Sequence, residues 1–213
     1  MLSRHYDAAE RESQMRRAGA STSRAVPVNM VREQPAMKRP AHRPLQAAVI
    51  GDASPPPEVA QAAEQLGRRL ARLGITVITG GLGGVMEAVS RGARQAGGLV
   101  VGIVPSSRLE EANPWCTVVL PTGLGHARNV LTALAGDLVI ALGGGAGTLS
   151  EICFAWIHGR PILLWEGSGG WTDRLEGAPL DSRASSTIHR CRSLDEIERV
   201  IRELFGDAPS ASV

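Results

Sequence analysis

Short apolar segments alternate with amphipathic segments from about residue 45 to residue 205. The apolar segments are five to seven residues long and read QAAVIG, ITVIT, LVVGIVP, CTVVLP, DLVIAL and RPILLW. Runs of this length and composition are typical of the buried strands of a parallel sheet. The segments between them carry apolar residues at intervals of three and four, which indicates helices. The alternation predicts an α/β fold, Rossmann-like and doubly wound, with a mainly parallel sheet and helices on both faces.

The predicted helices have recognisable ends. Ser54 is the expected N-cap of a helix over 54–74, which has prolines at its start and stops at Gly74. Ser193 and Glu196 have the spacing of a capping box, in which two side chains satisfy free backbone N–H groups at the start of a helix. Two further helices are expected over 84–98 and 148–159.

Charge is distributed unevenly along the chain. Residues 1–44 carry 9 of the 23 Lys and Arg residues and 4 of the 21 Asp and Glu residues, so the remainder is slightly acidic. Residues 1–44 also lack periodic apolar positions, and we expect a disordered basic extension there. A nucleotide-binding domain is expected over 45–206, followed by a flexible tail over 207–213. A slightly acidic domain argues against binding to nucleic acid.

The apolar runs and the cysteines indicate the cellular compartment of the protein. No apolar run is long enough for a membrane span, and none near the N-terminus is typical of a secretory signal. Cys116, Cys153 and Cys191 are isolated and lack the spacing of metal ligands, which favours reduced thiols. The sequence predicts a cytoplasmic protein without a membrane partner, a metal or a cofactor.

Two glycine-rich segments follow predicted strands: TGGLGGVMEA (Thr79–Ala88) and GGGAGTLSE (Gly143–Glu151). At the carboxyl ends of parallel strands, glycines let backbone N–H groups approach an anion, and helix N-termini favour negative charge. We therefore expect both loops to converge on one phosphate group. The residues assigned to phosphate or ribose are Gly80, Gly81, Gly83, Gly84, Gly144, Gly145, Gly147 and Thr148, with Glu87 as a ribose ligand or a partner of the helix dipole.

Common nucleotide-binding motifs are absent. The GxxxxGK[ST] pattern does not occur, and the first strand is followed by GDASPPP rather than by a glycine-rich loop. These absences argue against a P-loop NTPase and an NAD-dependent oxidoreductase. An alternative for the second glycine-rich segment is purely structural, because Thr148 and Glu151 also have the spacing of a capping box.

Three segments together, GGLGGVMEA, PTGLGHARN and GGGAGTLSE, resemble the LOG (Lonely Guy) family of phosphoribohydrolases, and the likeness covers about residues 45–205. The family's motif pairs an Arg with a Glu, and Arg128 and Glu151 are 23 residues apart, at the family's interval. The chain departs from the pattern at Gly143, where the cytokinin-activating enzymes have Pro, and at Asn129, where they have Lys. The segments are also similar to molybdenum-cofactor carrier proteins, which bind a phosphorylated pterin without hydrolysing a nucleotide.

The resemblance implies a homodimer or homotetramer that cleaves the N-glycosidic bond of a nucleoside 5′-monophosphate into free base and ribose 5-phosphate. An oxocarbenium-like sugar forms in such a reaction, and a nearby carboxylate can stabilise it and activate water. Glu151 is the predicted carboxylate, while Arg128 is predicted to hold the phosphate or sugar and to keep Glu151 ionised. His126 is either a proton donor to the base or a surface histidine. The alternative function is a non-catalytic carrier of a phosphorylated nucleotide or pterin.

The expected oligomer needs a close interface between subunits. The segment AVSRGARQAGG is rich in Ala and Gly, and we expect it to approach a partner subunit. Trp156 and Trp165 are expected to pack in the interior rather than to stack on a base.

Overall fold

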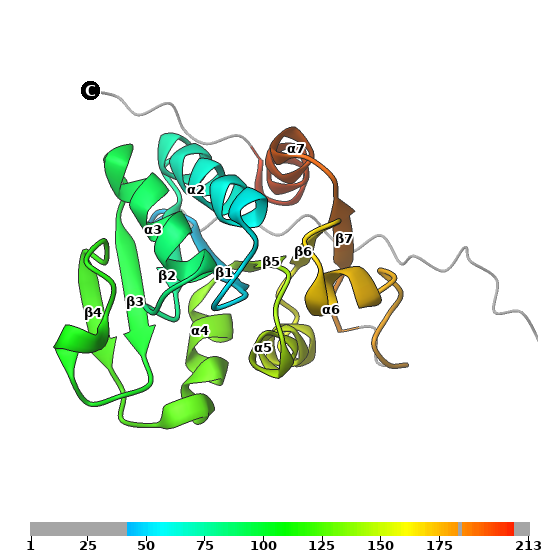
Figure 1. Ribbon diagram of the computed structural model, residues 1–213. Helices are drawn as coiled ribbons and strands as arrows, with labels where there is room; N and C mark the ends of the chain where they lie inside the picture. The colour runs from blue at the N-terminus through cyan, green and yellow to red at the C-terminus, as the bar shows by residue number, and fades with distance from the viewer. Residues whose placement is uncertain (1–41, 183–184, 207–213) are drawn as a thin grey trace, which may run out of the picture. The chain divides into compact units, whose positions relative to one another are not determined.

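A single parallel sheet organises the part of the chain that the computed structural model describes, residues 42–182 and 185–206. In this part the strand order is β4-β3-β2-β1-β5-β6-β7, and every neighbouring pair is parallel (Figure 1). The predicted α/β architecture is confirmed. The strands are β1 (Gln46–Gly51), β2 (Thr76–Thr79), β3 (Val100–Val104), β4 (Val118–Pro121), β5 (Leu138–Leu142), β6 (Ile162–Trp165) and β7 (Ile188–Cys191).

Helices cover both faces of the sheet (Figure 1). Successive residues of β1 alternate between two hydrophobic cores, with Ala47 and Val49 in one and Ala48 and Ile50 in the other. The first core contains α2 (Pro57–Arg72), α3 (Val85–Gln95) and α7 (Leu194–Phe205), and the second contains α5 (Ala146–Ile157). The shorter helices are α4 (Asn129–Ala135), α6 (Gly170–Arg174) and the 3-10 turns η1 (Leu109–Glu111) and η2 (Gly125–Arg128).

Two of the expected features are confirmed in detail. The Ser193 hydroxyl caps α7 by accepting a hydrogen bond from the Glu196 N–H at 3.1 Å. The Glu196 carboxylate reaches back to the N–H of Arg192, one residue before the position of an ideal capping box. Trp156 is buried, and Trp165 packs against the first core.

The expected N-cap of α2 is wrong. Pro56 occupies that position, and no side chain caps the helix. Ser54 instead lies in the preceding turn, where its N–H donates to the Asp52 carboxylate at 2.9 Å. Prolines that follow Ser54 delay the start of the helix, and Pro57 suits the first helical position because its fixed φ is helical and the N–H it lacks would have no intrahelical partner there.

The small residues of α3 pack against α2 of the same chain. The expectation that this Ala- and Gly-rich segment approaches a partner subunit is therefore not supported by its packing. A Cβ at Gly92 would lie 1.9 Å from the carbonyl oxygen of Glu64, and one at Gly67 would lie 2.1 Å from the carbonyl oxygen of Val89. These glycines let α2 and α3 approach each other at van der Waals distance. The helix face rich in small residues is therefore already covered.

The strand order reverses between β1 and β5, because the chain runs outward from β1 to β4 and then returns to the other edge of β1. Ligands of doubly wound sheets bind beyond the carboxyl ends of the strands at such a reversal. The loops after β1 and β2 meet there, since the Val85 N–H at the start of α3 donates to the carbonyl oxygen of Asp52 at 2.9 Å. The loop after β5 joins them through a bond from the Asp52 N–H to the carbonyl oxygen of Leu142 at 3.2 Å.

Candidate functional site

A buried ion pair lies at this end of the sheet. Arg128 ends η2, Glu151 lies in the second turn of α5, and the Arg128 Nη1 is 3.2 Å from the Glu151 Oε1. The two side chains are only 8% and 9% exposed. The same Nη1 donates to the Thr132 hydroxyl at 3.0 Å. The structure thus brings together the two residues that the sequence paired.

One donor of this arginine is left over. The Arg128 Nε is buried and has no hydrogen-bond partner among the described residues. Buried polar atoms of proteins normally have a partner, so an orphaned guanidinium N–H beside a carboxylate marks a place where a ligand atom can be bound.

Burial shifts the protonation of the pair. It raises the pKa of Glu151 from 4.5 to about 7, although the positive charge of Arg128 acts in the opposite direction. Burial also lowers the pKa of Arg128 from its usual value, and Glu151 opposes that change. A carboxyl group with a pKa near 7 can both accept and release a proton at neutral pH, which is the property of a general acid or base.

Gly80 makes room for the arginine. A Cβ at this position would lie 2.4 Å from the Arg128 Nη2 and 2.6 Å from Nη1, so a side chain here would require the guanidinium to shift. The sequence analysis assigned Gly80 to binding of the phosphate or ribose, whereas in the structure Gly80 lies against the guanidinium of Arg128.

The other glycines after β2 have different surroundings. Gly81 has a φ of +72° and packs against Val104, and its N–H donates to the Thr79 hydroxyl at 3.0 Å. Gly84 has a φ of +67° and lies against the backbone of the loop after β1. Gly83 faces open space, and Glu87 is half-buried in the first turn of α3. Gly81 and Gly84 therefore shape the loop, while Gly83 and Glu87 are accessible.

The loop after β5 presents the first turn of α5 to solvent. Gly145 is the N-cap, no side chain caps the helix, and Gly145, Ala146 and Gly147 are exposed. Before this turn, Gly144 is buried with a φ of +94°, and a Cβ there would collide with the Thr148 side chain. The N–H groups in the first turn of a helix lack intrahelical partners and carry partial positive charge, which suits them to a phosphate.

The capping-box alternative for Thr148 and Glu151 is wrong. The helix begins at Ala146, three residues earlier than such a box requires, and Gly145 occupies the cap position. The Thr148 hydroxyl lies 3.3 Å from the carbonyl oxygen of Gly51, to which it donates. Glu151 is therefore free of the helix terminus and available to Arg128.

Asn129 is a site residue whose role sequence reasoning missed. Its side chain is buried and donates to the Ser150 hydroxyl at 2.8 Å and to the carbonyl oxygen of Gly147 at 3.4 Å. It ties the start of α4 to the first turn of α5. Its position beside Arg128 was the only available signal. His126, on the same turn, is exposed.

No group of three or more His, Cys, Asp or Glu side chains in residues 42–182 and 185–206 is arranged to hold a metal ion. Across the same residues, no helix combines the length and apolar character that crossing a membrane requires.

Comparisons with known proteins identify the family and the fold of this chain. The sequence profile of the SLOG cluster4 family matches residues 44–197. An uncharacterized protein of Archaeoglobus fulgidus is 41% identical over 118 residues, which make up 55% of this chain and 78% of that protein. The cytokinin riboside 5′-monophosphate phosphoribohydrolase of Rhodococcoides fascians is 35% identical over 114 residues. That match spans 49% of this chain and 58% of the relative's length.

A solved structure is similar over a longer range. The molybdenum cofactor binding protein of Rippkaea orientalis is 30% identical with a TM-score of 0.66, and the match covers 76% of this chain and 98% of that one. The proteins similar to this chain thus include one named for hydrolysis and one named for cofactor binding.

Proposed function

The chain belongs to the SLOG cluster4 family, and from this premise we propose that it is a phosphoribohydrolase that cleaves the N-glycosidic bond of a nucleoside 5′-monophosphate. The observation that carries the proposal is the buried pair of Arg128 and Glu151 next to the exposed first turn of α5. A carrier needs the anion site but has no use for a buried carboxyl group with a pKa near 7. The products are the free base and ribose 5-phosphate.

Each part of the site has a task in this reaction. The N–H groups at the start of α5 bind the 5′-phosphate, and the Arg128 Nε–H binds an oxygen of the sugar or phosphate. The ionised Glu151 stabilises positive charge on the sugar as the bond to the base breaks, and the base leaves with the bonding electrons. Glu151 then takes a proton from the water that adds to the anomeric carbon and passes this proton to the departing base, which restores the carboxylate. General-base catalysis of this kind is worth roughly 10²–10⁴ in rate.

A second function, carriage of a phosphorylated pterin or nucleotide, is favoured by the similarity to the molybdenum cofactor binding protein over 76% of this chain. A carrier would use the same anion-binding turn. The two functions differ in Glu151, because only hydrolysis requires its ionised form.

We also propose a cytoplasmic homodimer or homotetramer. Cys116, Cys153 and Cys191 are free thiols, as expected for a reducing compartment. The exposed large apolar residues in the region of β4, η2 and α4 are a candidate subunit contact: Val118, Leu120, Leu124 and Leu131.

The test is to incubate the purified protein with a panel of nucleoside 5′-monophosphates and to measure ribose 5-phosphate. Turnover of any member supports the hydrolase. Stabilisation by AMP in a thermal melt without any turnover supports the carrier. Neither turnover nor stabilisation with any phosphorylated ligand contradicts both proposals.

A further inference from the structure

The segment after β6 holds the turn that precedes α5. The Gly143 N–H donates to the Ser168 Oγ at 2.7 Å and to the Thr172 Oγ1 at 3.1 Å. Both side chains are buried, at 7% and 0% exposure. The Ser168 hydroxyl lies 2.6 Å from the carbonyl oxygen of Trp165, the Thr172 hydroxyl lies 2.7 Å from that of Gly169, and the two hydroxyl oxygens are 2.8 Å apart, so each hydroxyl proton has an acceptor other than Gly143. Both oxygens therefore present lone pairs to one backbone N–H.

A second set of contacts joins the same two segments. The Trp171 N–H donates to the carbonyl oxygen of Gly144 at 3.0 Å. Gly170 packs so closely on this turn that a Cβ would lie 2.4 Å from the same carbonyl oxygen. The turn is thus held on consecutive residues, at the Gly143 N–H and at the Gly144 carbonyl.

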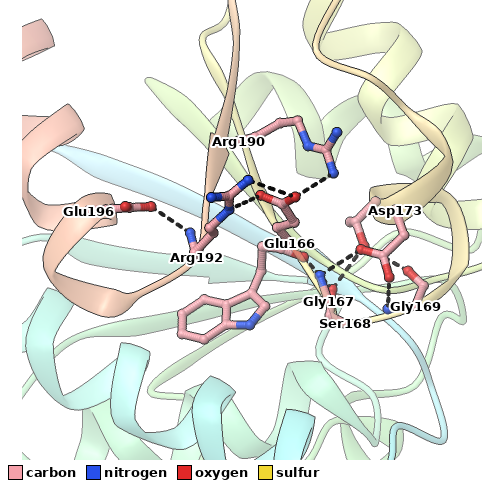
Figure 2. Close-up of polar contacts among 10 residues, drawn as sticks. Glu166, Gly167, Ser168, Gly169, Asp173, Arg190, Arg192 and Glu196 are labelled. Atoms are coloured by element: carbon pink, nitrogen blue, oxygen red, sulfur yellow. Dashed lines mark hydrogen bonds and ion pairs between the residues drawn. The ribbon is translucent and has the colours of Figure 1, made fainter.

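The holding segment is itself anchored (Figure 2). The Asp173 carboxylate accepts hydrogen bonds from the Gly167 N–H at 2.7 Å and from the Gly169 N–H at 2.9 Å, which fixes the loop on either side of Ser168. At the end of β6, the Glu166 carboxylate binds Arg190 at 2.9 Å and Arg192 at 2.8 Å. The hydroxyl groups of Ser168 and Thr172 therefore belong to a segment that hydrogen bonds and ion pairs hold in place.

The turn needs such support because of its backbone. Gly143 and Gly144 have φ values of +64° and +94°, and a flexible Gly-Gly pair has many other conformations available. The direction of the N–H groups of Ala146 and Gly147 follows from this turn. Proline at position 143 could not do the same, since its φ is near −65° and it has no N–H to donate.

We propose, resting on the proposed function, that Ser168 and Thr172 are positioning residues for the anion-binding turn. By holding the Gly143 N–H they orient the first turn of α5 toward the 5′-phosphate, without contacting the substrate. Because phosphate binding is equally strong in the ground state and the transition state, their loss should raise KM and leave kcat nearly unchanged.

The test uses three variants that remove hydroxyl groups: Ser168→Ala, Thr172→Val and the double variant of these two. They are compared with Thr172→Ser, which keeps the hydroxyl. Each single variant retains one acceptor for the Gly143 N–H, so the fold is expected to survive. We expect KM for AMP to rise about fivefold in each single variant and at least about 20-fold in the double variant, with Thr172→Ser near wild type. Ser186→Ala is the matched control, because this buried hydroxyl donates to the carbonyl oxygen of Arg160, before β6.

A second readout separates this proposal from the proposed function. Amide hydrogen exchange of residues 143–150 in the protein without ligand should be at least tenfold faster in the double variant and unchanged in Ser186→Ala. Faster exchange in a protein that neither binds nor cleaves AMP would refute the proposed function and keep the positioning role. Unchanged exchange, or a KM that responds equally to Ser186→Ala, would overturn the positioning role.

Discussion

Gly80 lies directly against the guanidinium of Arg128, so close that a Cβ on Gly80 would be 2.4 Å from Nη2. Because Gly80 has no side chain, the positively charged guanidinium of Arg128 can occupy its position beside Glu151. This dependence of one site residue on another leads to the first prediction.

Gly80→Ala should displace the guanidinium and weaken its interaction with Glu151. The positive charge now lowers the Glu151 pKa, so its displacement should move the midpoint of the pH–rate profile upward. Turnover at pH 7 should fall about fivefold for the first pH unit of this shift and about tenfold for each further unit. Gly83→Ala makes the same chemical change where nothing lies within 4 Å, and its midpoint should stay that of wild type. Equal midpoints for Gly80→Ala and wild type would contradict the proposed dependence.

Glu151→Gln should abolish most catalysis and retain ligand binding. The amide keeps the size of the carboxyl group but can neither stabilise an oxocarbenium ion nor take a proton from water, so turnover should fall by at least ~10²-fold. Ribose 5-phosphate release gives the rate, and the thermal shift with AMP gives the affinity. A variant that releases ribose 5-phosphate at the wild-type rate would remove Glu151 from the mechanism.

Wild-type turnover should rise with pH through about 7 and then level off. The ionised carboxylate is the active form, and burial raises its pKa to about 7. The test measures kcat between pH 5 and pH 9 with a substrate whose phosphate group keeps the same charge across that range. A rate that already levels off near pH 5 would mean that another group, or no proton transfer, limits the reaction.

The same shift has a consequence for stability. Protonated Glu151 is favoured in the folded state, so its contribution to the free energy of unfolding is lost as pH rises from 4.5 to about 7. Glu151→Gln escapes this loss, and its stability relative to wild type should increase over that interval by up to about 3 kcal/mol. Chemical denaturation at pH 5 and pH 8 measures the difference. A difference in stability between the variant and wild type that is the same at pH 5 and pH 8 would contradict the raised pKa of Glu151.

Two N-terminal deletions should show whether the part of the chain that the fold does not need ends at residue 41 or at residue 44. Residues 1–41 lie outside the described residues, whereas Arg43 makes a two-pronged ion pair with Asp137, at 2.7 Å for both contacts. Deleting 1–41 should leave the melting temperature unchanged. Deleting 1–44, or changing Arg43→Ala, should cost about 1–3 kcal/mol, because Asp137 is largely buried.

Arg199→Ala is the control for this comparison. It removes one partner of an exposed ion pair with Glu203, worth about 0–1 kcal/mol. A large drop in melting temperature on deletion of 1–41 would instead show that the extension stabilises the domain.

Leu124→Glu and Leu131→Glu should dissociate the proposed oligomer. Both side chains are exposed, at 52% and 41%; Leu124 immediately precedes η2, and Leu131 lies on α4. A charge placed in an apolar interface loses its hydration, so the subunits should separate. Light scattering at micromolar concentration reports the mass, and Leu99→Glu, an exposed apolar residue before β3, should leave it unchanged. A monomeric wild-type protein would refute the oligomer.

The sequence by itself determined the layers of the fold and the pairing of Arg128 with Glu151. Apolar runs such as Leu138–Leu142 are buried on both faces, which a parallel sheet between two helical layers requires, so their composition was sufficient. The paired Arg128 and Glu151 were found by a motif with a fixed interval. β7 was missed because Ile188–Cys191 is an edge strand with one buried residue, and α4 was missed because seven residues carry little periodic signal.

Only the tertiary structure decided what the remaining residues do. Gly80 and Gly83 look alike in the sequence, but one lies against a guanidinium and the other faces open space. Ser168 and Thr172 are 25 and 29 residues from the N–H they hold, and no local pattern links them to it. The pKa of Glu151 depends on burial by segments distant in the chain. Desolvation, steric room and hydrogen bonding between separate elements arise from packing, and the order of residues along the chain does not contain them locally.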